Sequence, residues 1–249
     1  MAKTLIGNDY SETADAGTTL QARLAGVRGE MEQAVAARLP GMGGAPPVLL
    51  GASKGQPVSV LEEAIGLGLT DFGENRVQEA LAKWRPIKEV YPRVRLHLIG
   101  PLQSNKAKEA VGLFDVIQTI DREKLADAVG DASARLGRTP ECFLQVNTGE
   151  EPQKGGVAPP GVEGLLRHAV EKSGLKVTGL MAVPPAGENP APHFALLKKL
   201  ADEFGLTQLS MGMSHDFALA IRLGATCVRI GTRLFGPRAD AAAGTGPAR

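Results

Sequence analysis

The chain has 249 residues, with 28 lysines and arginines against 27 aspartates and glutamates, so its balance of charge favours neither nucleic acid nor an anionic membrane as a partner. Its length fits one α/β domain with a sizeable core, and no apolar run approaches the ~20 residues of a membrane span. Cys142 and Cys227 lie in apolar, strand-like runs, which favours buried reduced thiols. The polar N-terminal stretch has no apolar signal core, and we therefore expect a soluble cytoplasmic protein.

The first predicted element is an amphipathic helix, because apolar residues recur at helical spacing from Thr18 to about Leu39. Residues 1–17 before it are expected to form a flexible tail. After a Pro- and Gly-rich break, short apolar runs bounded by turn residues alternate with helical patterns. The eight runs predicted to be strands are Val48–Ser53, Thr70–Gly73, Arg95–Ile99, Asp115–Thr119, Glu141–Val146, Val177–Met181, Thr207–Ser210 and Thr226–Ile230.

Seven helical patterns separate these strands, and Ser59 and Asp121 are the expected N-caps of two of them. The predicted helices are Ser59–Leu67, Val77–Val90, Asn105–Leu113, Asp121–Leu136, Pro160–Ser173, Ala191–Phe204 and Ser214–Leu223. Alternating strands and helices imply parallel strands, and eight of them imply closure into a (β/α)8 TIM barrel with an extra N-terminal helix. A doubly wound open sheet is the alternative, although no Gly-x-Gly-x-x-Gly follows the first strand. We expect one barrel domain over residues 18–238 and a frayed tail over 239–249.

In such a barrel the residues after each strand share one rim, where these folds carry their chemistry. Lys54 directly follows the first strand. It is either a solvated lysine or point charge for a phosphate, or a Schiff-base lysine. Ser210 to Ser214 and Gly231-Thr232 follow the last two strands and combine small residues with hydroxyls, which predicts a phosphate site. An ordinary helix cap and a turn are the alternatives.

Arg229 is a charged residue within the apolar last strand, and it therefore requires a partner. It forms either an ion pair in the barrel core or a contact to the pyridine nitrogen of a cofactor. An arginine there would keep that nitrogen unprotonated, because a guanidinium does not give up its proton. A nucleophilic lysine beside a phosphate site leaves two classes, a Schiff-base aldolase acting on a phosphosugar and a protein that holds pyridoxal 5′-phosphate.

Ordered motifs from one end of the barrel to the other then match one family. They are Ala52-Ser53-Lys54, Asp71 to Glu79, His97 to Lys106, Gln145 to Asn147, Gly179 to Met181, Leu209 to Ser214 with Asp216, and Val228 to Gly236. Over roughly residues 18 to 238 the chain resembles the pyridoxal phosphate homeostasis proteins, single-domain relatives of the alanine racemase barrel. The cofactor-binding residues that this resemblance implies are Lys54 as the Schiff-base lysine, Ser210, Gly231 and Thr232 on the phosphate, Arg229 at the pyridine nitrogen, and Asn75 near the cofactor.

The chain departs from the family pattern at several rim positions. Leu96 and Leu98 flank His97 where relatives commonly have Trp and Phe, Pro101 replaces a second histidine, and Gly55 replaces a frequent Thr or Val. None of these belongs to the set that holds the cofactor.

The resemblance to alanine racemase raises the question of catalysis, because racemases need a second base, a tyrosine from a separate domain of a partner subunit. The tyrosines here are Tyr10, in the tail, and Tyr91, near a helix end, and few residues follow Arg238. We therefore expect a monomeric, metal-free carrier without strong catalytic activity. It would bind pyridoxal phosphate and other B6 vitamers and deliver the cofactor to apo-enzymes through transient contacts. The alternative is a weak amino-acid racemase that uses Lys54 as its sole base.

Other candidate residues have structural interpretations. His97, within a strand, is expected to be a satisfied core histidine, and Trp84 is expected to pack. Lys154 is expected to be an ordinary loop lysine, with a transient second anion site as the alternative. The basic residues of the helix after the second strand predict a solvated face: Lys83, Arg85 and Lys88.

Overall fold

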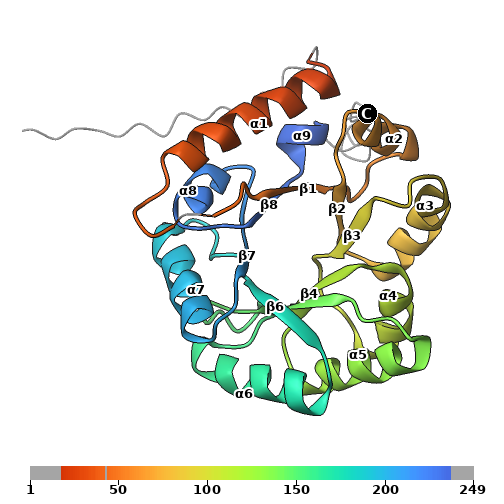
Figure 1. Cartoon of the computed structure of the whole chain (residues 1–249), viewed down its shortest axis with the longest axis vertical. Helices are drawn as coiled ribbons and strands as arrows, with labels where there is room; N and C mark the ends of the chain where they lie inside the picture. The colour runs from red at the N-terminus through yellow and green to blue at the C-terminus, as the bar shows by residue number, and fades with distance from the viewer. Residues whose placement is uncertain (1–17, 43, 237–249) are drawn as a thin grey trace, which may run out of the picture.

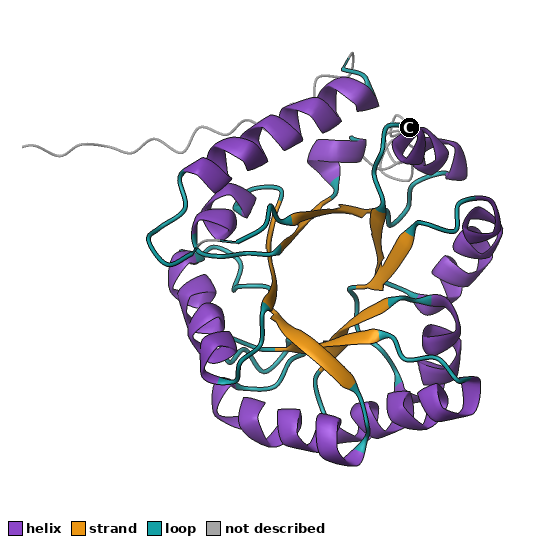
Figure 2. Ribbon diagram, viewed as in Figure 1, coloured by secondary structure: helices purple, strands orange, loops and turns teal. Residues whose placement is uncertain are grey.

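The computed structural model describes residues 18–42 and 44–236. Eight parallel strands form a closed barrel in chain order, with the last strand hydrogen-bonded to the first. The strands are β1 (Val48–Ala52), β2 (Asp71–Glu74), β3 (Arg95–Leu98), β4 (Val116–Ile120), β5 (Glu141–Gln145), β6 (Lys176–Met181), β7 (Gln208–Met213) and β8 (Cys227–Ile230). Figure 2 shows them as an inner ring surrounded by helices. The (β/α)8 prediction is confirmed, and the predicted tails lie outside the described residues.

The helices form the outer layer. They are α1 (Leu20–Ala36), α2 (Val58–Gly66), α3 (Val77–Val90), α4 (Ala107–Leu113), α5 (Glu123–Leu136), α6 (Val162–Arg167), α7 (Ala191–Glu203), α8 (Phe217–Arg222) and α9 (Thr232–Phe235). A π-helical turn, His168–Lys172, continues α6. The extra helix α1 packs across α8 and α9, and so covers the part of the barrel where the first and last strands meet (Figure 1).

Each predicted strand overlaps an observed one, but the region after Leu209 differs from its prediction. Strand β7 continues to Met213, so most of the predicted loop Ser210–Ser214 is strand. Helix α8 begins at Phe217 rather than Ser214. The reason is a turn between them. The carboxylate of Asp216 accepts a 2.6 Å hydrogen bond from the backbone N–H of Met213, and the backbone N–H of Asp216 donates to the Met213 carbonyl over 3.1 Å.

The two predicted N-caps are also wrong. Pro57 precedes α2 and its ring fixes a backbone angle suited to a helix start, so the helix begins at Val58 and Ser59 lies inside its first turn. The N-cap of α5 is Arg122, without a side-chain cap, and the Asp121 carboxylate pairs with the guanidinium of Arg122 instead. Helix α9 was not predicted, because four residues are too few to show a helical period.

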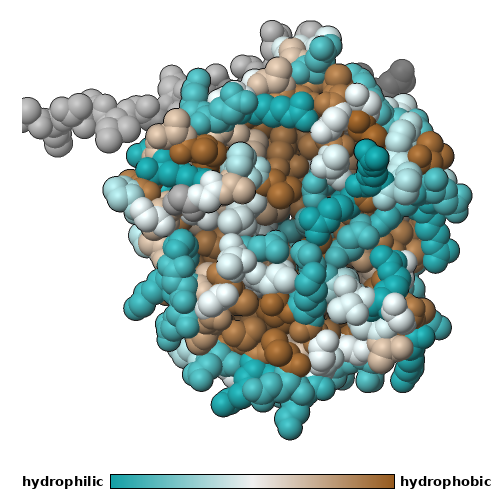
Figure 3. Space-filling view, viewed as in Figure 1, coloured by the Kyte–Doolittle hydropathy of each residue, from teal (hydrophilic) through white to brown (hydrophobic). Residues whose placement is uncertain are grey.

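Most of the hydrophobic core lies between the barrel and the helices. Trp84 of α3 is fully buried there against Phe72 of β2, with 4.9 Å between the ring centroids, so its predicted packing role is confirmed. A smaller apolar cluster of Val116, Phe143 and Met181 fills part of the barrel interior. Hydrophilic side chains cover much of the perimeter in the view down the barrel (Figure 3). In the described ranges, the helices are too short or too polar to cross a bilayer.

One glycine of α5 is required by its packing rather than by its backbone angles. A Cβ at Gly130 would lie 2.2 Å from the backbone carbonyl oxygen of Ser173. We therefore expect Gly130→Ala to destabilise the fold by about 2 kcal/mol, because the contact cannot relax by a side-chain rotation. Gly26→Ala in α1 is the matched control, because its Cβ would meet nothing within 4 Å. Helix propensity predicts a gain of roughly 0.8 kcal/mol for it. Urea unfolding measures both, and a stabilised Gly130→Ala would contradict the packing.

The two thiols are free and buried, as the sequence predicted. Burial raises the pKa of Cys142 to about 12 and that of Cys227 to about 11. Since the thiolate is the reactive form, both should react with a thiol-specific disulfide reagent at pH 8 far more slowly in the native protein than in urea. Rapid native labelling of either cysteine would show that its strand is open to solvent.

Candidate functional site

The six predicted binding residues lie on one arc of four adjacent strands. Ser210 is in β7, Arg229 is in β8, and Gly231 and Thr232 directly follow β8, while Lys54 and Asn75 come just after β1 and β2. These strands are neighbours because β8 pairs with β1, with Gly51 opposite Ile230. A Cβ on Gly231 would lie 3.6 Å from Ala52, two residues before Lys54. Closure of the barrel therefore brings the predicted lysine and phosphate positions to one rim.

The backbone before Lys54 is fixed by strand β2. Ser53 is fully buried, and its N–H donates to the carbonyl of Gly73 over 2.9 Å. Its hydroxyl lies 3.1 Å from the same carbonyl and 2.7 Å from Oε1 of Glu74. Ser53 therefore cannot turn without breaking bonds to two residues of β2.

Helix α3 holds the backbone on both sides of Lys54. Lys83 donates from Nζ to the Ser53 carbonyl over 2.9 Å. Glu79 accepts from the Gly55 N–H over 3.2 Å. We call Ser53, Glu74, Glu79 and Lys83 the Lys54 clamp. It holds the backbone at Lys54 in place. The side chain of Lys54 itself is partly exposed and extends from that point.

A buried ion pair lies at the centre of the Lys54 clamp. Glu74 is fully buried, its Oε1 lies 2.6 Å from Nζ of Lys83, and it also accepts a 2.8 Å hydrogen bond from the Trp84 indole. The predicted solvated face is therefore wrong for Lys83, whose side chain is 11% exposed. Lys88 is engaged as well, 2.5 Å from Asp115, and Arg85 is exposed as predicted. A glutamate within a buried strand requires a cation nearby, and this is the signal that would have identified Lys83 as its partner.

Arg229 points into the barrel, where it is 5% exposed. Its Nη1 donates to the carbonyl of Ser210 over 2.8 Å and to the Ser210 hydroxyl over 2.7 Å, and its Nη2 donates to the Ala182 carbonyl over 2.8 Å. In the described part of the chain these partners are carbonyl and hydroxyl oxygens, where the alternative interpretation expected an ion pair. Burial lowers the pKa of the Arg229 guanidinium. The arginine is thus a fixed, buried set of hydrogen-bond donors.

Ser210 lies on the same side as Arg229. Its hydroxyl is fully buried and donates to Oε1 of Gln118 over 2.6 Å, so its side chain faces the barrel interior in this structure. Gly231 and Thr232 instead form the start of α9, where the first N–H groups of a helix have no partner within the helix. Gly212, within the first predicted phosphate segment, has a φ of 92°, a conformation that favours glycine.

The loops after β3 and β5 contain contacts of two residues considered in the sequence, Asn75 and Lys154. A Cβ on Gly100 would lie 2.3 Å from the backbone oxygen of Asn75, so the loop after β3 packs directly on Asn75. In the loop after β5, Lys154 pairs with Glu151 at 2.6 Å and donates to the Pro184 carbonyl over 3.0 Å. These contacts agree with the ordinary loop role expected for Lys154.

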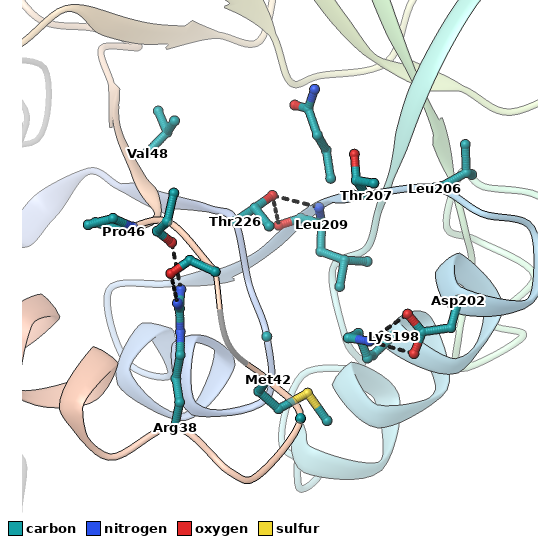
Figure 4. A pocket seen from close by; sticks show the side chains of 15 residues that line it. Arg38, Met42, Pro46, Val48, Lys198, Asp202, Leu206, Thr207, Leu209 and Thr226 are labelled. Atoms are coloured by element: carbon teal, nitrogen blue, oxygen red, sulfur yellow. Dashed lines mark hydrogen bonds and ion pairs between the residues drawn. The ribbon is translucent and has the colours of Figure 1, made fainter.

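A hollow of about 490 Å³ lies at the opposite end of the barrel. Its walls include Val48, the first residue of β1, and Thr226, just before β8, with Arg38 and the ion pair of Lys198 with Asp202 around it (Figure 4). Because TIM barrels carry their chemistry at the other end of the strands, we do not assign the cofactor to this hollow. Residues 18–42 and 44–236 contain no cluster of three or more side chains suited to hold a metal ion.

Comparisons with known proteins identify the family of this chain. Residues 52–239 match the family model of the alanine racemase N-terminal domain. The pyridoxal phosphate homeostasis protein of Aquifex aeolicus is 44% identical over 199 residues, which cover 76% of this chain and 86% of that protein. The protein of the same name from Escherichia coli K12 is 36% identical over 199 residues, covering 76% and 85%.

Solved structures are also similar to this chain. PipY of Synechococcus elongatus, with pyridoxal phosphate bound, is 36% identical with a TM-score of 0.74, covering 88% of this chain and all of that one. An alanine racemase of Clostridium difficile, 13% identical with a TM-score of 0.62 over 85% of this chain and 56% of its own, shares the fold. The chain therefore belongs to the pyridoxal phosphate homeostasis protein family.

Proposed function

We propose that the chain binds pyridoxal 5′-phosphate at the rim of β7, β8, β1 and β2, as a reversible Schiff base with Lys54. It would act in cytoplasmic homeostasis of the cofactor and deliver it to apo-enzymes as a monomer. The observation that carries the proposal is the clamped Lys54 beside the Gly231 segment, with the buried Arg229 donors on the next strand. The PLP-bound PipY structure, at 36% identity, supports the same ligand.

The residues of the rim fit the three functional groups of the cofactor. Lys54 offers an amine for the aldehyde, and the hydroxyl and backbone N–H groups at Gly231 and Thr232 suit the phosphate. Arg229 suits the ring nitrogen, because a guanidinium has donors only and an unprotonated pyridine nitrogen accepts. When bound, the cofactor supplies an aldehyde that condenses with primary amines. The Lys54 amine would form a C=N bond and release one water, and the reverse reaction with water or another amine would free the cofactor.

Two features favour a carrier over a racemase. An arginine at the ring nitrogen leaves that nitrogen unprotonated, which weakens the ring as an electron sink. Of the two tyrosines, Tyr91 lies within the described residues, and it follows the last residue of α3. The chain there leads to the start of β3, at the end of the barrel opposite Lys54. The second base that two-sided proton transfer requires is thus not offered by that tyrosine. A weak racemase with Lys54 as sole base is the alternative, and turnover of amino acids by the pure protein would distinguish it.

The Schiff base gives the proposed function a direct test. We expect the wild type to absorb in the visible with pyridoxal phosphate, and borohydride to reduce the chromophore onto the peptide that contains Lys54, as mass spectrometry would detect. Lys54→Ala should remain colourless and unlabelled, because the reacting amine is absent. A wild type that stays colourless with added cofactor would refute the proposal. Activation of a cofactor-free enzyme by the loaded protein tests delivery.

The Lys54 clamp predicts a second effect, through Lys83. Lys83→Met would leave Glu74 buried without its cation and should lower the free energy of unfolding by about 3 kcal/mol. It should also slow formation of the Schiff base, because the Ser53 carbonyl loses its donor.

Lys88→Met, on the same helix, is the matched control. Its pair with Asp115 is more exposed, so the loss should be about 1 kcal/mol or less, with no change in the rate of Schiff-base formation. Urea unfolding and stopped-flow absorbance measure both effects. Equal rates in the two variants would show that the clamp does not position Lys54.

A further inference from the structure

A chain of buried polar side chains crosses the interior of the barrel. Its members come from five strands and are at most 8% exposed: Asp71 of β2, His97 of β3, Gln118 of β4, Ser210 of β7 and Arg229 of β8. We call these five residues the barrel chain. The family resemblance implies that Ser210 and Arg229 bind the cofactor and gives no role to Gln118, and the position of His97 within a strand predicted only a core role for it.

Consecutive members of the barrel chain are within hydrogen-bond distance. Ser210 Oγ lies 2.7 Å from Nη1 of Arg229 and 2.6 Å from Oε1 of Gln118. His97 lies 3.0 Å from Nε2 of Gln118 through Nδ1 and 3.0 Å from Oδ1 of Asp71 through Nε2. The Gln118–Ser210 bond joins β4 to β7, which are not neighbours in the barrel, so it spans the interior.

The donors of the barrel chain all run in one direction. Arg229 has donors only, so the Ser210 oxygen accepts from it and spends its own proton on Gln118 Oε1. The amide nitrogen of Gln118 then faces His97 Nδ1, which must accept, so the proton of the imidazole lies on Nε2 and is donated to the Asp71 carboxylate. This assignment satisfies every bond. The opposite amide orientation would set Gln118 Oε1 against His97 Nδ1, which are two acceptors when the imidazole proton lies on Nε2.

Asp71 anchors the far end. Burial raises the pKa of this carboxyl, but hydrogen bonds from His97 and Thr70 and the charge of Arg95 outweigh it and hold the pKa below its ordinary value. The carboxylate is thus available as the terminal acceptor. Arg229, at the other end, receives its orientation from Ser210 and from the carbonyl of Ala182.

We propose that Gln118 and His97 are positioning residues for the ring nitrogen of the cofactor. They hold the Ser210 hydroxyl as an acceptor toward Arg229, and so fix the guanidinium in the orientation that meets the nitrogen. This inference rests on the proposed function, specifically on Arg229 contacting that nitrogen.

A cofactor analogue isolates the contact. In 1-deaza-pyridoxal 5′-phosphate a C–H group replaces the ring nitrogen, while the aldehyde and phosphate remain. We expect the wild type to bind pyridoxal phosphate more tightly than the analogue by about tenfold or more, the worth of one hydrogen bond from a charged donor. Dissociation constants come from titration of the Schiff-base absorbance of the full chain with each compound.

The variant Gln118→Met removes both bonds of the amide. The preference for the natural cofactor over the analogue should fall by about tenfold, while the affinity for the analogue changes little. Thr119→Val is the matched control on the same strand. Within the described residues the Thr119 hydroxyl is buried without a hydrogen-bond partner, so this substitution removes no bond of the barrel chain. The preference should be unchanged in this control.

Two substitutions of His97 separate positioning from a general loss of packing. His97→Asn retains an acceptor close to the position of Nδ1 and should keep most of the preference, whereas His97→Gln reaches toward Asp71 but not Gln118 and should lose it. Thermal melting of both shows whether they are folded. A preference that follows melting temperature instead of the retained bond would overturn the proposal.

The remaining outcomes show which of three claims is wrong: the positioning role, the contact of Arg229 with the nitrogen, or the proposed function. If Arg229→Met abolishes the preference and Gln118→Met leaves it intact, the positioning role is wrong while the proposed function stands. If the wild type binds both compounds equally, Arg229 does not contact the nitrogen, and this inference falls with that contact. If neither compound gives a chromophore, the proposed function itself fails.

Discussion

The parallel pairing of β8 with β1 is the constraint on which the site depends. It aligns Val48 with Cys227 and Gly51 with Ile230, and it places the last strand of the chain beside the first. Gly51 is required at this seam, because a Cβ there would lie 2.8 Å from Leu69 and 3.0 Å from Phe235. In the open-sheet alternative, β1 and β8 need not be neighbours, and Lys54 would have no reason to lie near Gly231. Closure makes one rim out of residues that are about 180 positions apart.

Strand β2 connects the two polar systems of the molecule. Its four residues alternate between the interior and the outer layer, so that Asp71 faces the barrel chain while Glu74 faces α3 and the Lys54 clamp. The clamp holds the backbone around the lysine from outside the barrel wall, and the barrel chain holds Arg229 from inside. Both place a fully or nearly fully buried carboxylate against a cation or a directed donor, which offsets the cost of removing that charge from water. One short strand therefore supports both ends of the proposed cofactor site.

The sequence predicted the barrel and its rim because these depend on local signals. Apolar runs of strand length, turn residues at their ends and the position of Lys54 after the first run are all readable without tertiary contacts. Local patterns failed where a distant partner decides the outcome. The Ser210 hydroxyl faces inward because Gln118, 92 positions away along the chain, accepts from it. Lys83 is largely withdrawn from solvent because it pairs with the buried Glu74. The extension of β7 to Met213 depends likewise on a turn closed by Asp216.

The choice of arginine at position 229 has a physical reason within this interior. A lysine in the same place would lose its charge readily on burial, whereas a guanidinium retains its proton even though burial lowers its pKa. The interior offers that charge carbonyl and hydroxyl oxygens directly, and Ser210, Gln118 and His97 connect it to the carboxylate of Asp71. Such a site donates hydrogen bonds to a ring nitrogen but does not transfer a proton to it. Under the proposed function, the barrel would hold a reactive aldehyde and keep the ring nitrogen unprotonated, so that a carbanion would be poorly stabilised. That combination suits storage and transfer of the cofactor better than catalytic turnover.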